Sequence, residues 1–167
     1  SDYYGSGIKI PFEDDISGKL THIGGMAFYN NGTITQNINI RYPVKTDRNT
    51  LISQLQSALI EYGFSVKSIS DSAPCYVDKD NPIIQRLTNI ANYTLGTKLE
   101  PYTMGGGTYA RKLKNAVGYG PAITGLESDF GVTRGKGHQP DEYISFDIMK
   151  KAFFIYINAV KELDMFV

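Results

Sequence analysis

The sequence predicts an α/β fold in two small layers, each with sheet on one side and helices on the other. Two segments flank an Asn-Asn-Gly turn, and the alternation of apolar residues in the second of them predicts a hairpin. Three segments with apolar residues at helical spacing, two of them with a candidate N-cap, predict helices. The chain has 167 residues, of which 41% are hydrophobic and 20% are charged. This length and composition suit one globular domain or two small lobes.

The first predicted layer begins with a β-hairpin. Residues 20–29 and 33–42 form its strands, and the turn at residues 30–32 contains Asn-Gly, which supplies the positive φ angles of a tight turn. Pro43 ends the second strand, because proline cannot donate to the hydrogen-bond ladder.

A helix and a further strand are predicted to complete this layer. Thr46 or Asp47 can cap the helix, and Gly63 stops it. Residues 64–69 are expected to form the strand. The predicted apolar stripe of the helix consists of Leu51, Ile52, Leu55, Ala58 and Leu59.

The second layer begins with another helix. Asn81 is a good N-cap, Pro82 stands where a first-turn proline is tolerated, and Gly96 ends the helix. Three short elements are expected next: a strand over residues 98–103, a helix over 108–113 and a strand over 115–119.

A long glycine-rich loop and a final helix are predicted at the end of the chain. A loop as long as residues 120–140 is usually functional or disordered. The helix is expected to begin near Ser145. Its predicted buried face comprises Ile148, Met149, Ala152, Phe153, Tyr156, Ala159, Val160 and Leu163.

The charge and cysteine content exclude several classes of function. Seventeen basic residues balance seventeen acidic ones, so nothing favours binding to nucleic acid or to an anionic membrane. No apolar run reaches the roughly 20 residues of a membrane helix. Cys75 is the single cysteine, which fits a reducing compartment, and we interpret it as a buried or half-buried thiol. The polar start at Ser1 lacks an initiator Met and signal-peptide features, so we expect a boundary within a longer polypeptide.

Two histidines offer metal-binding nitrogens. Neither His22 nor His138 has a His or Cys neighbour at metal-ligand spacing, so a closed structural zinc site is not expected. His138 ends the long loop just before the final helix, where it can present its imidazole to a metal. The alternative, a solvated loop histidine, is favoured by the residues alone. We assign His22 no role.

Two further features suggest ligand binding. The three glycines at 105–107 either let a ligand approach bare backbone or form a tight turn with positive φ angles. They lack the Gly-Lys-Ser/Thr ending of a phosphate loop, which disfavours a nucleotide. Arg41 ends the second hairpin strand, where it can grip a carboxylate with two hydrogen bonds or serve as a surface charge.

Three segments together resemble a known metallopeptidase family. Residues 39–44 (NIRYPV), 105–111 (GGGTYAR) and 138–143 (HQPDEY) occur in that order in the family of PepV-like zinc dipeptidases, carboxypeptidase G and aminoacylase. The resemblance extends from about residue 20 to the C-terminus.

The resemblance implies a role for each matching position. His138 would bind one of two zinc ions, Arg41 would hold the substrate carboxylate, and Gly107 would offer its backbone N–H to the substrate. The family's other zinc ligands, its general-base Glu and its oxyanion-stabilising His lie in a preceding part that this chain lacks. We therefore expect this chain alone to bind no zinc and to be inactive. Residues 1–74 would be the second half of a lid domain, and residues 75–167 the C-terminal strand and helix segment of the zinc-peptidase catalytic domain.

The function predicted by the resemblance is that of a dipeptidase fragment. The intact parent would hydrolyse short peptides with a free C-terminal carboxylate in the cytoplasm. The alternative is a non-catalytic binding or dimerisation module on the same scaffold. A truncated catalytic lobe should expose apolar surface that its missing half would cover, so we expect self-association or poor solubility of such a fragment.

Overall fold

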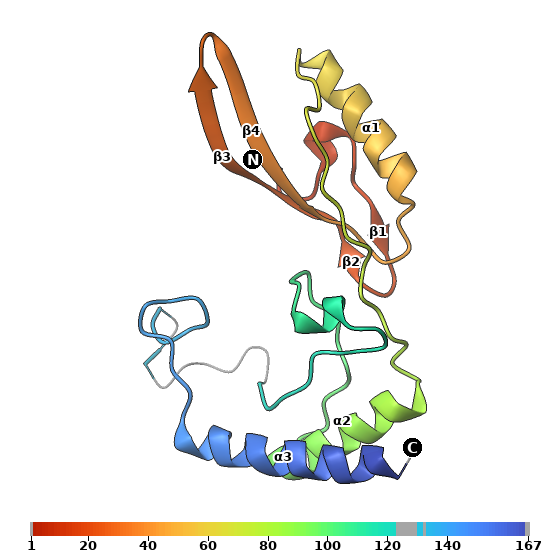
Figure 1. The fold of residues 1–167 in the computed structure, drawn as a ribbon, viewed down its shortest axis with the longest axis vertical. Coiled ribbons are helices and arrows are strands. Elements are labelled where there is room, and N and C mark those ends of the chain that lie inside the picture. The colour runs from red at the N-terminus through yellow and green to blue at the C-terminus, as the bar shows by residue number, and fades with distance from the viewer. Residues whose placement is uncertain (1, 123–129, 132, 166–167) are drawn as a thin grey trace. The chain divides into compact units, whose positions relative to one another are not determined.

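The computed structural model describes residues 2–122, 130–131 and 133–165 (Figure 1). Among them, small antiparallel sheets and three α-helices confirm the mixed α/β class predicted from the sequence. The elements in chain order are η1 (Ser6–Ile8), β1 (Glu13–Asp14), β2 (Gly18–Lys19), β3 (Thr21–Asn30), β4 (Thr33–Arg41), α1 (Arg48–Glu61), α2 (Pro82–Leu95), η2 (Tyr109–Lys112) and α3 (Phe146–Asp164).

The chain forms two compact units. The first comprises the residues up to Tyr76 together with Thr103–Ala116. The second comprises Val77–Tyr102 and the described residues from Val117 onward. The segment of the three glycines therefore belongs to the same unit as the hairpin. The predicted domain boundary after residue 74 remains a prediction.

The predicted hairpin is confirmed as β3 and β4, which appear as the long paired strands in Figure 1. Thr21 pairs with Arg41 at its open end, and Asn30 pairs with Thr33 at the turn. Asn31 and Gly32 between them have φ angles of 48° and 78°. This pair of positive angles is what a two-residue turn requires to match the twist of the strands.

The core of the first unit lies at the base of the hairpin. Ile10, Leu20 and Leu51 are buried there, with Ile40 and other partly buried side chains around them. Leu51 comes from α1, whose first turn is capped by Asp47: its carboxylate accepts a hydrogen bond from the Thr50 N–H at 2.7 Å. The predicted helix and one of its two candidate caps are thereby confirmed.

Three predicted strands are wrong. Residues 64–69, 98–103 and 115–119 have no strand pairing. Each of these short apolar runs fits a strand locally, but a strand needs a partner ladder, and none lies beside them in the described residues. The helix predicted over 108–113 is instead the short 3₁₀ helix η2.

The second unit is built on the helix pair α2 and α3. Asn81 caps α2 by accepting from the Ile83 N–H at 2.9 Å. Gly96 ends this helix with a φ angle of 69°, in the left-handed region that favours glycine. Ser145 caps α3 by accepting from the Ile148 N–H at 3.3 Å. These predicted boundaries are confirmed. The buried apolar residues of this unit are Leu87, Ile155 and Ala159.

The predicted buried face of α3 is partly wrong. Met149, Phe153 and Val160 are 48%, 60% and 68% exposed, whereas Ile155, left out of the predicted face, is fully buried. Apolar side chains occupy more of the circumference of α3 than one neighbouring helix can cover. The position of that neighbour decides which of them are buried.

Two further observations complete the fold. Cys75 is exposed, so the expected buried or half-buried thiol is wrong; its sulfur lies 3.4 Å from the Ala116 carbonyl oxygen. None of the helices formed by the described residues is both long and apolar enough to cross a bilayer. Part of the loop predicted over residues 120–140 lies outside the described residues.

Candidate substrate-binding site

Arg41 stands at the open end of the hairpin as the last residue of β4. The residue is exposed, and its guanidinium forms no hydrogen bond or ion pair with any residue that the structure describes. Its side chain lies against Gly105: a Cβ added to that glycine would stand 3.3 Å from Arg41 Cδ and 3.8 Å from Nη1. The structure therefore brings together two of the three segments that the sequence singled out.

A hydrogen-bonded anchor holds the chain just after Arg41. The Asp14 carboxylate accepts from the Ile16 N–H at 3.0 Å and from the Lys45 N–H at 2.8 Å. Ser17 Oγ accepts from the Val44 N–H at 2.9 Å and donates to Asp14 at 2.9 Å. These bonds tie the segment that leaves β4 to the small hairpin of β1 and β2.

The electrostatics of Asp14 follow from this anchor. Burial raises the pKa of its carboxyl, but hydrogen bonds from Ser17, Lys45 and Ile16 outweigh burial and lower the pKa to about 2. Donors that point at the ionised form stabilise it. The anchor therefore depends on Asp14 being a carboxylate.

The three glycines at 105–107, here called the glycine loop, follow a residue fixed to the same small hairpin. Thr103 Oγ1 donates to the Ile16 carbonyl oxygen at 3.2 Å. None of the three glycines has a positive φ angle, so the alternative of a left-handed tight turn is wrong. Because the glycines lack a Cβ, arginine side chains can pack directly against their backbone.

Arg111 is the second of these arginines. It belongs to η2, which Thr108 begins by accepting from the Ala110 N–H at 3.3 Å. Its Nη2 donates to Ser72 Oγ. Its side chain covers Gly107, where an added Cβ would stand 2.8 Å from Arg111 Cδ and 3.2 Å from Cζ. The sequence analysis gave Arg111 no role, although an arginine four residues after a glycine loop was a signal worth following.

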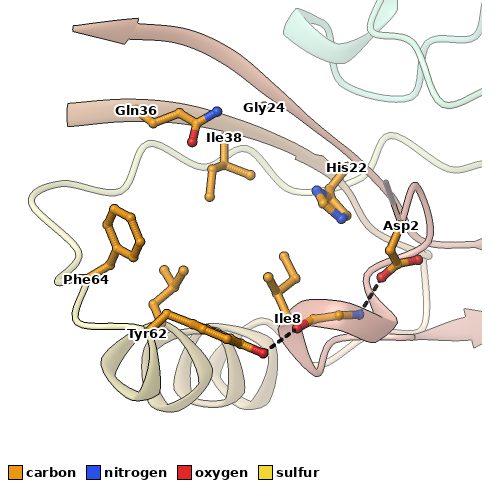
Figure 2. Close-up of a pocket in the computed structure, with 10 residues that line it drawn as sticks. Asp2, Ile8, His22, Gly24, Gln36, Ile38, Tyr62 and Phe64 are labelled. Carbon is orange, nitrogen blue, oxygen red and sulfur yellow. Dashed lines mark hydrogen bonds between the residues drawn. The ribbon is translucent and has the colours of Figure 1, made fainter. Parts of the chain in front are cut away.

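A separate hollow of about 450 Å³ lies between the hairpin and the end of α1 (Figure 2). His22 and Ile38 from the hairpin face Ile8, Tyr62 and Phe64 across it. The His22 Nε2 atom is buried there and has no hydrogen-bond partner among the described residues. The lining is mainly apolar, so the hollow offers little to a charged ligand.

His138 lies in the second unit, in a loop with its own internal bonds. The Asp141 carboxylate accepts from Arg134 Nε at 3.0 Å and from the Gly135 N–H at 3.2 Å. The Arg134 guanidinium and, next, the Gly135 N–H lower the pKa of Asp141. Glu142 accepts from the His138 backbone N–H at 2.9 Å.

The His138 imidazole itself is left exposed. The residue has a φ angle of 68°, and its ring forms no hydrogen bond with any described residue. The ring is therefore not packed inward or bonded to its own backbone. Its assignment as a metal ligand remains a prediction, as do the substrate-binding roles of Arg41 and Gly107.

The described residues do not fit a complete zinc site. They bring no three His, Cys, Asp or Glu side chains together in a way that could hold a metal ion. Zinc sites in proteins use three or four protein ligands. One imidazole falls short of that number, and the nearby Glu142 carboxylate already accepts from the His138 backbone.

Comparison with known proteins decides the family. The model of Peptidase family M20/M25/M40 matches residues 7–162, most of the chain. The chain belongs to this family. The resemblance found in the three sequence segments is thereby confirmed. M20 proteins are peptidases and are generally metal-dependent.

Curated relatives of this M20 chain carry dipeptidase names. "Putative dipeptidase YtjP" of Bacillus subtilis is 35% identical over 163 residues, which are 97% of this chain and 33% of that protein. Staphylococcus aureus proteins of strains USA300 and NCTC 8325, also named "Putative dipeptidase", are 32% identical over 161 residues, or 96% of this chain and 33% of their own length. The chain spans about a third of the length of the curated relatives it matches.

Proposed function

We propose that this chain supplies the substrate-carboxylate site and one metal ligand of a metal-dependent dipeptidase. The dipeptidase names of the relatives and the M20 family support the reaction class. The intact enzyme would use two zinc ions, act in the cytoplasm and hydrolyse short peptides with a free C-terminal carboxylate. The chain alone would be inactive, because one imidazole is too few ligands for a catalytic zinc site.

The observation that carries this proposal is the position of Arg41 beside the glycine loop. The Arg41 guanidinium forms no hydrogen bond or ion pair with the described residues, so it would be available to an incoming carboxylate, which it could hold with two parallel hydrogen bonds. The Gly107 N–H would donate a hydrogen bond to the peptide backbone, while the Arg111 side chain occupies the space that a Cβ would fill. A peptide could thus be held at its C-terminal carboxylate and at its backbone by one unit of this chain.

His138 would present its imidazole to a metal from the second unit. Its backbone N–H donates to the Glu142 carboxylate, so the loop is fixed while the ring stays exposed. Other parts of the enzyme would provide the remaining metal ligands. The metal would supply Lewis-acid assistance to hydrolysis when bound.

Peptide binding to the isolated chain tests the proposed carboxylate site. The neutral dipeptide Ala-Gln is titrated into the ¹⁵N-labelled chain, and the amide signals of the glycine loop are followed by NMR. Arg41→Gln is expected to weaken binding about tenfold or more, since a charged hydrogen bond contributes roughly 1.5–3 kcal/mol. Lys112→Gln makes the same charge change on an exposed neighbour of the loop and is expected to have little effect.

Two results would contradict the proposal. Binding that Arg41→Gln leaves unchanged would remove the carboxylate role. Zinc-dependent hydrolysis of Ala-Gln by the chain alone, followed by amine release, would show that the chain holds a complete active site. The expected result is Arg41-dependent binding without hydrolysis.

The second candidate, a non-catalytic dimerisation module, would associate through one face of α3. Phe153 and Val160 are 60% and 68% exposed, and Phe146 at the start of the helix is 82% exposed. Exposed apolar side chains on one helix face mark a surface that associates in water. With the chain alone in solution, the available partner is a second copy.

Sedimentation velocity tests this second candidate. We expect association that increases with concentration, and Phe153→Glu is expected to shift the chain toward monomer. Tyr93→Glu on α2 is a control at a residue that is 88% exposed. A monomeric wild-type chain over the same concentration range would exclude self-association through α3.

A further inference from the structure

The arginines of the chain divide into two groups. Three pair with carboxylates: Arg48 with Asp71 at 2.8 Å, Arg86 with Glu162 at 2.6 Å and Arg134 with Asp141 at 3.0 Å. The other two, Arg41 and Arg111, have no carboxylate partner among the described residues.

Both arginines without a carboxylate partner border the glycine loop. Arg41 lies against Gly105, and Arg111 covers Gly107. Two residues of extended chain span at most about 7 Å, so the two contact points are close together. Like charges disfavour one another at short range, and an anion placed beside both would relieve that repulsion.

Arg111 is also held in place. Its Nη2 donates to Ser72 Oγ, and its aliphatic part rests on a residue that lacks a Cβ. A planar guanidinium fixed on one side by a hydroxyl keeps its other N–H groups for a ligand. Lysine would retain the charge at this position but would lose the bidentate geometry.

We propose that Arg111 is a second carboxylate-binding residue, which makes this site selective for peptides with an acidic C-terminal residue. Arg41 would hold the α-carboxylate, and Arg111 would hold the side-chain carboxylate of a C-terminal Asp or Glu. The two carboxylates of one such residue are close enough to reach two arginines on neighbouring points of one short loop. This inference rests on the proposed function of Arg41 and extends it to the substrate side chain.

The test compares two dipeptides that differ in one charge. Ala-Glu and Ala-Gln have nearly the same shape, but only Ala-Glu carries a second carboxylate. Each is titrated into the ¹⁵N-labelled chain, with the amide signals of the glycine loop and the Arg111 Nε–H as readouts. We expect Ala-Glu to bind about tenfold more tightly than Ala-Gln at low salt, and we expect added salt to reduce the difference.

Variants separate Arg111 from Arg41. Arg111→Gln is expected to abolish the preference for Ala-Glu, because it should weaken Ala-Glu binding about tenfold more than Ala-Gln binding. Arg111→Lys should keep part of the preference, and Ser72→Ala should reduce it without any change of charge. Lys112→Gln is the matched control, since it removes the neighbouring positive charge and should leave the preference intact. Signal dispersion in each spectrum reports whether the variant remains folded.

The outcomes distinguish this inference from the proposed function. If Arg41→Gln weakens the binding of both peptides but Arg111→Gln changes the binding of neither, the proposed function survives and the role of Arg111 is overturned. If Arg111→Gln weakens the binding of both peptides equally, the selectivity for an acidic C-terminal residue is also overturned. The same conclusion follows if sodium acetate shifts the same signals as strongly as Ala-Glu. If Arg41→Gln has no effect on Ala-Gln, the proposed carboxylate site itself fails.

Discussion

The glycine loop and the loop around His138 use arginine in opposite ways. Arg134 lies within the His138 loop and pairs with Asp141, so its charge is neutralised there. Arg41 and Arg111 lie beside the glycine loop with no carboxylate partner in the described residues. One loop contains an internal ion pair, whereas the arginines beside the other would be available to a ligand under the proposed function. The presence of an arginine does not by itself distinguish these two uses, because they differ in whether a carboxylate lies beside the guanidinium.

The largest change in stability that would distinguish the two loops is expected from a substitution at the base of the hairpin. Leu20 is fully buried in the core that supports Arg41. Leu20→Ala is expected to destabilise the chain by about 2–5 kcal/mol, since it removes buried methyl groups and leaves a cavity. Urea unfolding measures the change.

A neighbouring strand residue serves as its control. Ile23 is 62% exposed, so Ile23→Ala should change stability by no more than about 0.5 kcal/mol. Dipeptide binding at the glycine loop should weaken with Leu20→Ala under conditions where the internal bonds of the His138 loop persist. If Leu20→Ala disrupted the internal bonds of the His138 loop as much as dipeptide binding at the glycine loop, the two loops would not differ in their dependence on this core.

An intermediate effect is expected from the Asp14 anchor, and it depends on pH. The folded-state pKa of Asp14 is about 2, below its ordinary value of 3.8. A group with a depressed folded pKa stabilises the fold above its unfolded pKa, and this contribution is lost as pH falls through the folded pKa. Wild type should therefore lose stability between about pH 4 and pH 2.

Asp14→Asn isolates this contribution. The variant should be less stable than wild type at pH 7, and the difference should shrink as pH falls toward 2, as measured by unfolding at each pH. Glu13→Gln removes a neighbouring exposed carboxyl that forms no hydrogen bond or ion pair with the described residues. A difference that stays constant from pH 7 to pH 2 would mean that the ionised form of Asp14 does not hold the anchor.

The smallest effect is expected within the His138 loop. Asp141→Asn removes the charge that pairs with Arg134 and accepts from the Gly135 N–H. We expect faster amide hydrogen exchange at Gly135 with an unchanged unfolding midpoint, because the bonds are local to this loop. Asp164→Asn at the end of α3 is the control. Unchanged exchange at Gly135 would show that the loop keeps its shape without the ion pair.

Local signals in the sequence predicted the helices and the hairpin well. The caps at Asp47, Asn81 and Ser145 satisfy N–H groups within three residues, so their effect does not depend on the rest of the fold. Asn31 and Gly32 form the hairpin turn because both adopt positive φ angles, which likewise does not depend on the rest of the fold.

Predictions that needed a distant partner failed. Residues 64–69 have a strand-like pattern but no neighbouring strand in the described residues, and instead Phe64 lines the hollow beside the hairpin. Met149 and Phe153 continue the apolar pattern of α3, yet both are exposed in the second unit. Periodicity shows which residues are apolar but not which of them a neighbour will cover.

The candidate site was predictable in part. The segments around Arg41 and the glycine loop stood out in the sequence, and the structure brings them together. The spacing of Arg111 after the glycine loop was visible in the sequence, but its hydrogen bond to Ser72, 39 residues earlier, was not. The role of Asp14 likewise arises from a contact with Lys45, 31 residues later.

The backbone angle of His138 has a consequence for how its imidazole should be replaced. At a φ angle of 68° most side chains crowd their own main chain, while Asn, Asp and His are the non-glycine residues found there most often. An amide at this position would delete the ring nitrogens yet retain the tolerated conformation. A methyl or branched replacement would alter conformational preference and chemistry at once, and the two effects could not be separated.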